Sequence, residues 1–224
     1  MKSEAVLPEK SGNFEILIKK DVIREENILA ENNRKIFRNK GITAINIMGS
    51  VGSGKTTLIK ALCRKLKDRY RIKVIAGDIT TDIDAKRIKE EGVDVEQINT
   101  GGMCHLDANL INKSINEIGT YGKDIIFIEN VGNLICPANF DLGEEKRIVV
   151  ISVTEGPYMV LKHPLMFKEA CLVVINKTDL ADVMEVNPDK FEDEVHSIQP
   201  KADVIKTSLK NLENIDEIIK AIGF

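Results

Sequence analysis

The chain has 224 residues, enough for one α/β domain with a substantial core, and its formal net charge is −3. This charge balance, the lack of tryptophan and the 4% of aromatic residues argue against a nucleic-acid partner. The first eight residues lack the apolar core of a signal peptide, no apolar run reaches membrane-spanning length, and four cysteines fit a reducing compartment, so we expect a cytoplasmic protein with no membrane partner.

Two regions differ in pattern. Residues 1–40 contain a long, charged, roughly amphipathic stretch at 13–39, which predicts a helical extension packed outside the core. In residues 41–224, strand-like and helix-like runs alternate, which indicates a mostly parallel sheet with helices on both faces. We expect strands at 42–48, 72–78, 125–129, 148–153, 171–176 and 202–205, and helices at 57–66, 82–91, 105–118, 189–198 and 215–222.

A complete phosphate-binding loop, G-x-x-x-x-G-K-[ST], follows the first of these strands. Its backbone N–H groups and the start of the next helix form a nest for nucleotide phosphates. Lys55 is expected to reach the β- and γ-phosphates, and Thr56 offers a hydroxyl to Mg²⁺. The residues predicted to bind the phosphates are Gly49, Ser50, Val51, Gly52, Ser53, Gly54, Lys55, Thr56 and Thr57.

Two acidic residues, Asp78 and Glu129, end predicted strands at the same sheet edge as the phosphate loop. With Thr56 they could hold Mg²⁺ directly or through water. Glu129 begins an E-N-V-G run where many GTPases have D-x-x-G, so the N–H of Gly132 is expected at the γ-phosphate. No glutamine follows it and no arginine stands out as a catalytic finger, so we expect slow hydrolysis without a second subunit or partner.

A cysteine and a histidine are adjacent at Cys104 and His105, and Cys136 follows Gly132 by four residues. These three side chains could share a metal ion, although three ligands do not close a tetrahedral site. Small buried cysteines are also common in ordinary cores. Composition alone therefore leaves both interpretations open.

The run Asn176-Lys177-Thr178-Asp179 directly follows a buried strand. The carboxylate of Asp179 can accept hydrogen bonds from two guanine donors that adenine lacks, and a site built for such pairs rejects the wrong base strongly. The stem of Lys177 can lie along the base, and Asn176 can tie back to the phosphate loop. A backbone N–H at Ser208, after the last strand, is expected at the guanine carbonyl. The pattern predicts a GTP site.

Together these motifs resemble the HypB-type hydrogenase nickel-incorporation (maturation) GTPases, which are of the SIMIBI class of P-loop GTPases. The resemblance covers residues 35–224 and is most specific in the G-G-M-C-H and E-N-V-G-N-L stretches. The matching runs are residues 49–57, 77–87, 99–107, 129–137 and 176–179.

The resemblance implies a cytoplasmic GTPase that uses GTP and Mg²⁺ and assists nickel insertion into [NiFe] hydrogenase. It implies that Cys104, His105 and Cys136 bind Zn²⁺ or Ni²⁺ near the interface of a GTP-dependent homodimer. The expected partners are a nickel-binding maturation protein and the hydrogenase large-subunit precursor. Residues 1–40 depart from the family pattern, since they carry no C-x-x-C site and no histidine-rich tract.

Three alternative functions remain, which differ in the type of protein or in the enzyme that it serves. A urease-type nickel accessory GTPase has a similar fold but a different motif from E-N-V-G-N. A metal-bridged GTP switch would act mainly as a binding module, with hydrolysis as a timer. A small-molecule kinase would need an arginine-rich lid and would not need N-K-x-D. A turnover assay with and without Ni²⁺ and the hydrogenase precursor separates these possibilities.

Overall fold

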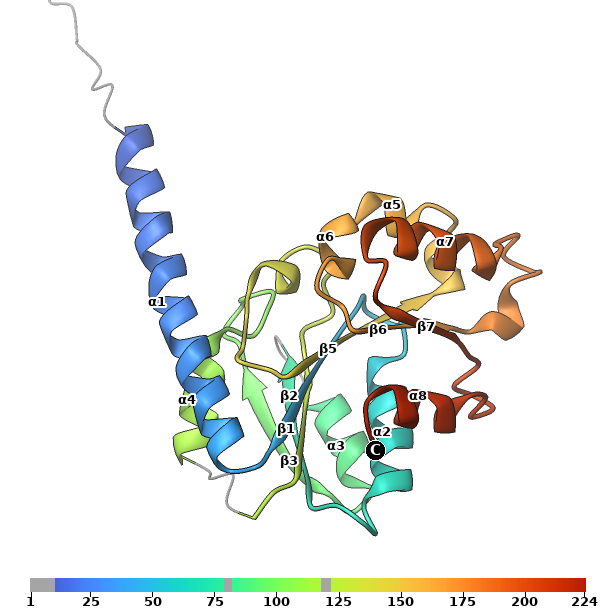
Figure 1. The fold of residues 1–224 in the computed structure, drawn as a ribbon, viewed down its shortest axis with the longest axis horizontal. Coiled ribbons are helices and arrows are strands. Elements are labelled where there is room, and N and C mark those ends of the chain that lie inside the picture. The colour runs from blue at the N-terminus through green and yellow to red at the C-terminus, as the bar shows by residue number, and fades with distance from the viewer. Residues whose placement is uncertain (1–10, 79–81, 118–121) are drawn as a thin grey trace, which may run out of the picture.

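Seven parallel strands form the centre of the molecule (Figure 1). The computed structural model describes residues 11–78, 82–117 and 122–224, and in these ranges the strand order is β3-β2-β4-β1-β5-β6-β7. Every neighbouring pair is parallel, which confirms the predicted fold class. The strands are β1 (Thr43–Met48), β2 (Ile72–Asp78), β3 (Asp94–Asn99), β4 (Ile125–Glu129), β5 (Lys146–Ser152), β6 (Leu172–Asn176) and β7 (Asp203–Lys206).

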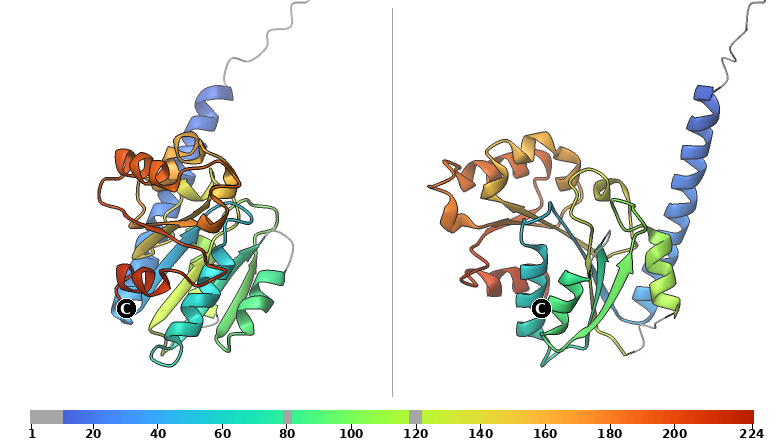
Figure 2. Two further views of the ribbon diagram at one scale, coloured as in Figure 1. Left: turned by 90° about the vertical axis from the view of Figure 1, so that its right-hand side faces the viewer. Right: turned by 180° about the vertical axis from the view of Figure 1, so that it is seen from behind.

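Helices cover both faces of this sheet (Figure 2). Apolar residues of α2, α3 and α8 form one buried cluster against one face. On the other face, α1 and α4 pack over β1, β2 and β4, and α5 to α7 pack over β5 and β6. The helices are α1 (Ser11–Asn39), α2 (Lys55–Leu66), α3 (Ile83–Lys89), α4 (Ala108–Glu117), α5 (Met159–Lys162), α6 (Pro164–Phe167), α7 (Pro188–Ile198) and α8 (Ile215–Ala221).

Strands β4 and β6 are buried along their whole length, and β1 and β5 are buried except at their first residue, as expected for a parallel sheet covered on both faces. Their continuous Ile and Val runs made them visible in the sequence. Strand β3 was not predicted, because its sequence D-V-E-Q-I-N is mostly polar and it lies at the sheet edge. Glu96 of β3 forms an ion pair with the fully buried Lys73 of β2, and the distance between Lys73 Nζ and Glu96 Oε2 is 2.9 Å.

Helix α1 confirms the predicted helix, and its first half extends beyond the rest of the fold (Figures 1 and 2). The prediction that it packs outside the core is wrong for its second half, because Ala30 and Phe37 are buried and Phe37 belongs to an apolar cluster with β1, β2 and β4. Its second half packs along α4. Asn33 is fully buried, and its Nδ2 donates to the carbonyls of Ala108 and Leu142 at 2.9 and 3.0 Å. Glu26 accepts from the N–H of Ala108 at 2.9 Å, so α1 fixes the start of α4.

Within the described ranges, no helix has both the length and the apolar character needed to span a membrane. The predicted helix at 105–118 begins three residues later than expected, at Ala108, and its position 118 lies outside the described residues. The short helices α5 and α6 were not predicted.

Candidate functional site

The phosphate loop joins β1 to α2 in the strand–loop–helix arrangement that the motif predicts. Gly49 and Gly54 have φ of 149° and 114°, which side chains of L-residues rarely adopt. A Cβ at Gly49 would lie 2.2 Å from the carbonyl oxygen of Val150, and one at Gly54 would lie 2.2 Å from Nδ2 of Asn176. The backbone here therefore requires glycine at both positions.

Lys55 lies at the first position of α2 and is 7% exposed. Its Nζ donates to the carbonyls of Gly49 at 3.2 Å and Ser50 at 2.9 Å, so the ammonium group is held inside the loop. Burial lowers the pKa of Lys55, while nearby carboxylates, with Glu129 the strongest, oppose that shift. The side chain is thus a confined positive charge at the centre of the loop.

Thr56 and Glu129 come together directly below the loop. Thr56 Oγ1 donates to Glu129 Oε1 at 2.6 Å, and Glu129 is 4% exposed. Burial raises the pKa of Glu129 to about 7, and the hydrogen bond from Thr56 and the charge of Lys55 act in the opposite direction. Glu129 Oε2 is buried and has no hydrogen-bond partner among the residues that the structure describes.

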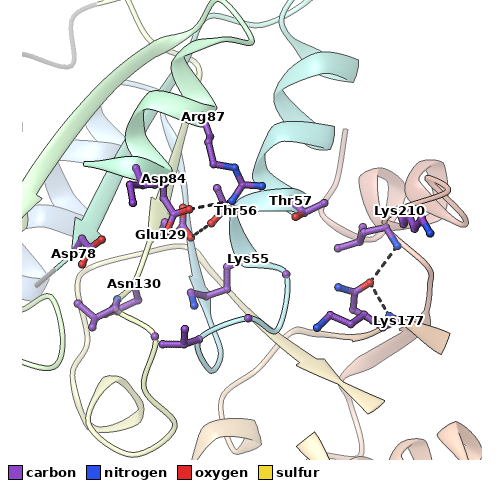
Figure 3. A pocket seen from close by; sticks show the side chains of 18 of the residues that line it. Lys55, Thr56, Thr57, Asp78, Asp84, Arg87, Glu129, Asn130, Lys177 and Lys210 are labelled. Atoms are coloured by element: carbon purple, nitrogen blue, oxygen red, sulfur yellow. Dashed lines mark hydrogen bonds and ion pairs between the residues drawn. The ribbon is translucent and has the colours of Figure 1, made fainter. Parts of the chain in front are cut away.

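These oxygen atoms fit Mg²⁺. A hydroxyl and carboxylates are the hard ligands that this ion prefers, and a divalent cation would satisfy the orphaned oxygen of Glu129. Asp78, at the end of β2, faces the same cavity (Figure 3). The parallel order β2-β4-β1 places Asp78 and Glu129 at one sheet edge beside the phosphate loop.

A cavity of about 840 Å³ runs over this edge from the phosphate loop to the end of β6 (Figure 3). Its size lies within the usual range of small-molecule sites. Gly49, Ser50 and Ser53 do not line it, although the rest of the loop does. The predicted nucleotide and magnesium residues in its wall are Val51, Gly52, Gly54, Lys55, Thr56, Thr57, Asp78, Glu129, Gly132, Asn176, Lys177, Asp179 and Ser208.

Asn176 joins the two ends of this cavity. Its Nδ2 donates to the carbonyl of Ser53 in the phosphate loop at 2.8 Å, which is the predicted tie. Its Oδ1 accepts from the N–H groups of Lys177 at 2.7 Å and Leu209 at 3.1 Å. The buried side chain therefore fixes the segments around Asp179 and Ser208 relative to the phosphate loop, while Asp179 itself is exposed.

The three predicted metal ligands form a second site on neighbouring loops. One ligand atom each from Cys104, His105 and Cys136 lies within 4.8 Å of the others. Cys104 Sγ is 3.8 Å from His105 Nδ1, and the His105 ring stacks on Phe140 with 3.8 Å between ring centroids. Burial lowers the pKa of His105, which favours the neutral, metal-binding imidazole, while a hydrogen bond with Cys104 raises the pKa of Cys136.

Thiolate and imidazole ligands suit Zn²⁺ and also Ni²⁺. Cys104 and Cys136 are 32 residues apart in the sequence, but the fold brings them together. A shared metal ion explains this proximity better than two unrelated cysteines do. Three ligands leave room for a fourth from water or another chain.

Residues 43–206 match the family described as "CobW/HypB/UreG, nucleotide-binding domain". The probable hydrogenase maturation factor HypB of Methanocaldococcus jannaschii is 47% identical over 205 residues, covering 92% of this chain and 93% of that protein. The chain belongs to the HypB family.

Two solved structures of the family have the same fold. The hydrogenase maturation factor HypB from Archaeoglobus fulgidus has a TM-score of 0.82 and 41% identity, over 88% of this chain and 96% of that one. HypB from Helicobacter pylori, solved in complex with nickel, has a TM-score of 0.80 and 34% identity, over 88% and 92% of the two chains. The resemblance drawn from the motifs is thereby confirmed.

Two charged residues of α3 in the cavity wall were not predicted. Asp84 and Arg87 lie three residues apart on α3, and Arg87 Nη1 is 3.2 Å from Asp84 Oδ1. Both side chains line the cavity, and their charges act on the pKa of Glu129 in opposite directions (Figure 3). An arginine was not expected in this cavity. The available signal was the i,i+3 spacing of these residues on the first helix after Asp78.

Proposed function

We propose that the protein hydrolyses GTP to GDP and phosphate and thereby assists nickel insertion into [NiFe] hydrogenase. The observation that carries this proposal is the position of Cys136 in the loop that begins at Glu129 and passes Gly132. One segment thus links the nucleotide cavity to a cluster of metal ligands. The hydrogenase maturation role of relatives at 41–47% identity supports this function.

In this proposal, Asp179 selects guanine and the backbone N–H of Ser208 meets the guanine carbonyl. Lys55 stabilises the negative charge that develops on the phosphates, as preorganised positive groups do in phosphoryl transfer. Thr56, Asp78 and Glu129 would hold Mg²⁺, which neutralises charge on the β- and γ-phosphates. The buried pair of Thr56 and Glu129 at 2.6 Å supports this assignment.

The metal at Cys104, His105 and Cys136 is Zn²⁺ or Ni²⁺ in this proposal. The nickel-bound structure of the Helicobacter pylori relative favours nickel as cargo. Nickel would arrive from a nickel-binding maturation protein and pass to the hydrogenase large-subunit precursor in the cytoplasm.

A GTP-dependent homodimer would complete the site. Three ligands per chain leave a coordination position for a second subunit. The exposure of the apolar side chains Tyr158, Leu161 and Leu165, which are 54–57% exposed, supports self-association.

The base preference gives the direct test of the GTP assignment. The unmodified protein should bind and hydrolyse GTP and bind ATP weakly. Asp179→Asn should weaken GTP binding and partly restore binding of xanthosine triphosphate, because the Asn amide can donate to the carbonyl at C2 of that base. Titration with the three nucleotides measures this. Equal affinity of the unmodified protein for ATP and GTP would refute the assignment.

Turnover of GTP with and without Ni²⁺ and the hydrogenase precursor separates the enzyme from a switch that mainly binds partners. A maturation GTPase should turn over faster when its client and metal are present. A rate that neither of them changes would favour the binding module.

A further inference from the structure

Two asparagines flank Gly132, the residue expected at the γ-phosphate, and each contacts the loop of a different metal ligand. Asn130 is 1% exposed, and its Oδ1 accepts from the N–H of Leu106 at 3.1 Å and from that of Val131 at 2.9 Å. Leu106 directly follows His105. One carboxamide oxygen therefore joins the Cys104–His105 loop to the segment leading to Gly132.

Asn133 makes the corresponding contacts on the Cys136 side. Its Oδ1 accepts from the N–H groups of Ile135 at 2.8 Å and Cys136 at 3.2 Å. Its backbone forms an antiparallel bridge with Gly49, the first residue of the phosphate loop. Asn133 thus joins the turn that presents Cys136 to the phosphate loop.

Gly132 itself lies against the phosphate loop. A Cβ added there would lie 2.5 Å from Val51 Cγ2 and 3.0 Å from the backbone nitrogen of Val51. A shift of Gly132 toward or away from a γ-phosphate must therefore move the adjoining residue, Asn133, or break its bridge to Gly49.

The two asparagines differ in what holds them. Asn130 Nδ2 donates to Asn46 Oδ1 at 3.3 Å, and Asn46 Nδ2 donates to Glu144 Oε1 at 3.2 Å. Glu144 in turn accepts from Arg147 Nε at 2.9 Å, and all four side chains are buried. Asn130 is thus anchored in the core, whereas the side-chain hydrogen bonds of Asn133, among the residues that the structure describes, stay within its own half-buried turn.

We propose that Asn133 is the positioning residue that couples the nucleotide to the metal: it carries the displacement of Gly132 to Cys136, while Asn130 keeps Cys104 and His105 fixed. This inference rests on the proposed function, since it requires both GTP and a metal ion to bind. Linkage makes the coupling reciprocal, so a nucleotide that changes metal affinity has its own affinity changed by metal to the same factor.

The test compares metal affinity in two nucleotide states. Affinity for Zn²⁺ and for Ni²⁺ is measured by competition with a chromophoric chelator, in the presence of GDP and of a non-hydrolysable GTP analogue. The unmodified protein should show a ratio of at least about fivefold between the two states, the lower end of typical coupling. Asn133→Ala should bring this ratio close to one, while GTP-analogue affinity without metal stays within about twofold.

Two variants supply the controls. Asn133→Asp keeps an oxygen that accepts from both N–H groups, so it should retain the ratio. Asn139→Ala removes an exposed side chain of the same segment that donates to the carbonyl of Ile135, and it should also retain the ratio. If Asn133→Ala does not fold, Asn133→Gln gives the same comparison, because its longer side chain moves the acceptor away from the two N–H groups.

The outcomes separate this inference from the function on which it rests. A ratio that persists in the folded Asn133→Ala variant overturns the role of Asn133, as does a ratio of one in the unmodified protein when it binds both ligands. An unmodified protein that binds neither GTP nor metal would instead refute the proposed function.

Discussion

The nucleotide cavity and the metal cluster are neighbours built in different ways. Lys55 and Thr56 begin a helix, and Asp78 and Glu129 end strands of the sheet. The predicted ligands Cys104, His105 and Cys136 all lie on loops, where side chains and a ring contact hold them in place. Regular elements place these four cavity residues, whereas turns and side-chain contacts place the three residues of the cluster. The geometry of the cavity therefore follows from the sheet, and that of the cluster depends on its loops.

The largest effect is expected when the positive charge of Lys55 is removed from the cavity. Lys55→Ala should abolish measurable GTP turnover, a loss of at least about 100-fold, and most nucleotide affinity, because one preorganised cation at the phosphates is lost. Metal affinity of the nucleotide-free variant should be unchanged, since Lys55 contacts its own loop and not the cluster. Phosphate-release assays and chelator competition measure the two properties.

Lys60→Ala is the matched control, because Lys60 lies on the same helix and pairs with Glu90 at 3.1 Å away from the cavity. It should leave turnover unchanged. A Lys55→Ala variant that loses metal binding while folded would show that the two sites are not separate units.

Arg87 tests whether the cavity contains a catalytic arginine of its own. Arg87→Ala should slow hydrolysis by about 100-fold, the usual cost of losing one donor to a transition state, and should change GTP affinity only a few-fold. Single-turnover rates and nucleotide titration separate the two effects. Neighbouring Lys86, whose partner is Asp82, gives the control variant Lys86→Ala. Equal rates for Arg87→Ala and the unmodified protein would assign Arg87 to structure alone.

The same contrast explains what could be predicted from the sequence. The phosphate loop, the acidic strand ends and N-K-x-D stand at fixed places relative to buried strands, so their convergence on one edge follows from a parallel sheet. Arg87 was missed because its place in the cavity depends on how α3 packs, and its i,i+3 spacing from Asp84 does not fix its position relative to the phosphate loop. Strand β3 was missed because it pairs polar residues at an edge, including Glu96 with buried Lys73.

The metal cluster could be predicted only in part. Adjacent Cys104 and His105 suggested a ligand pair, but they follow β3 and Cys136 follows β4, so their approach depends on the order β3-β2-β4 in the sheet. The sequence did not predict the contacts of Asn130 and Asn133 with these loops, because it shows only that both residues belong to the E-N-V-G-N motif. Their roles follow from hydrogen bonds across 24 residues, from Asn130 to Leu106, and across three, from Asn133 to Cys136.

The smallest effect concerns the stability cost of a rigid, buried carboxylate. Since burial raises the pKa of Glu129 from 4.5 to about 7, this group favours the folded state below pH 4.5. That contribution is lost as the pH rises through 7, because the folded protein must then hold a buried charge. This pKa shift corresponds to a loss of folding stability of the order of 3 kcal/mol at most between low and high pH. Because Gln carries no charge, Glu129→Gln should raise the free energy of unfolding at pH 8 by about 1–3 kcal/mol in EDTA without nucleotide. At pH 4.5 the gain in stability should nearly vanish.

Urea unfolding at both pH values measures this gain, and Glu145→Gln, at an exposed position, is the control. A loss of stability at pH 8 would mean that the ionised carboxylate is held by partners other than a bound metal.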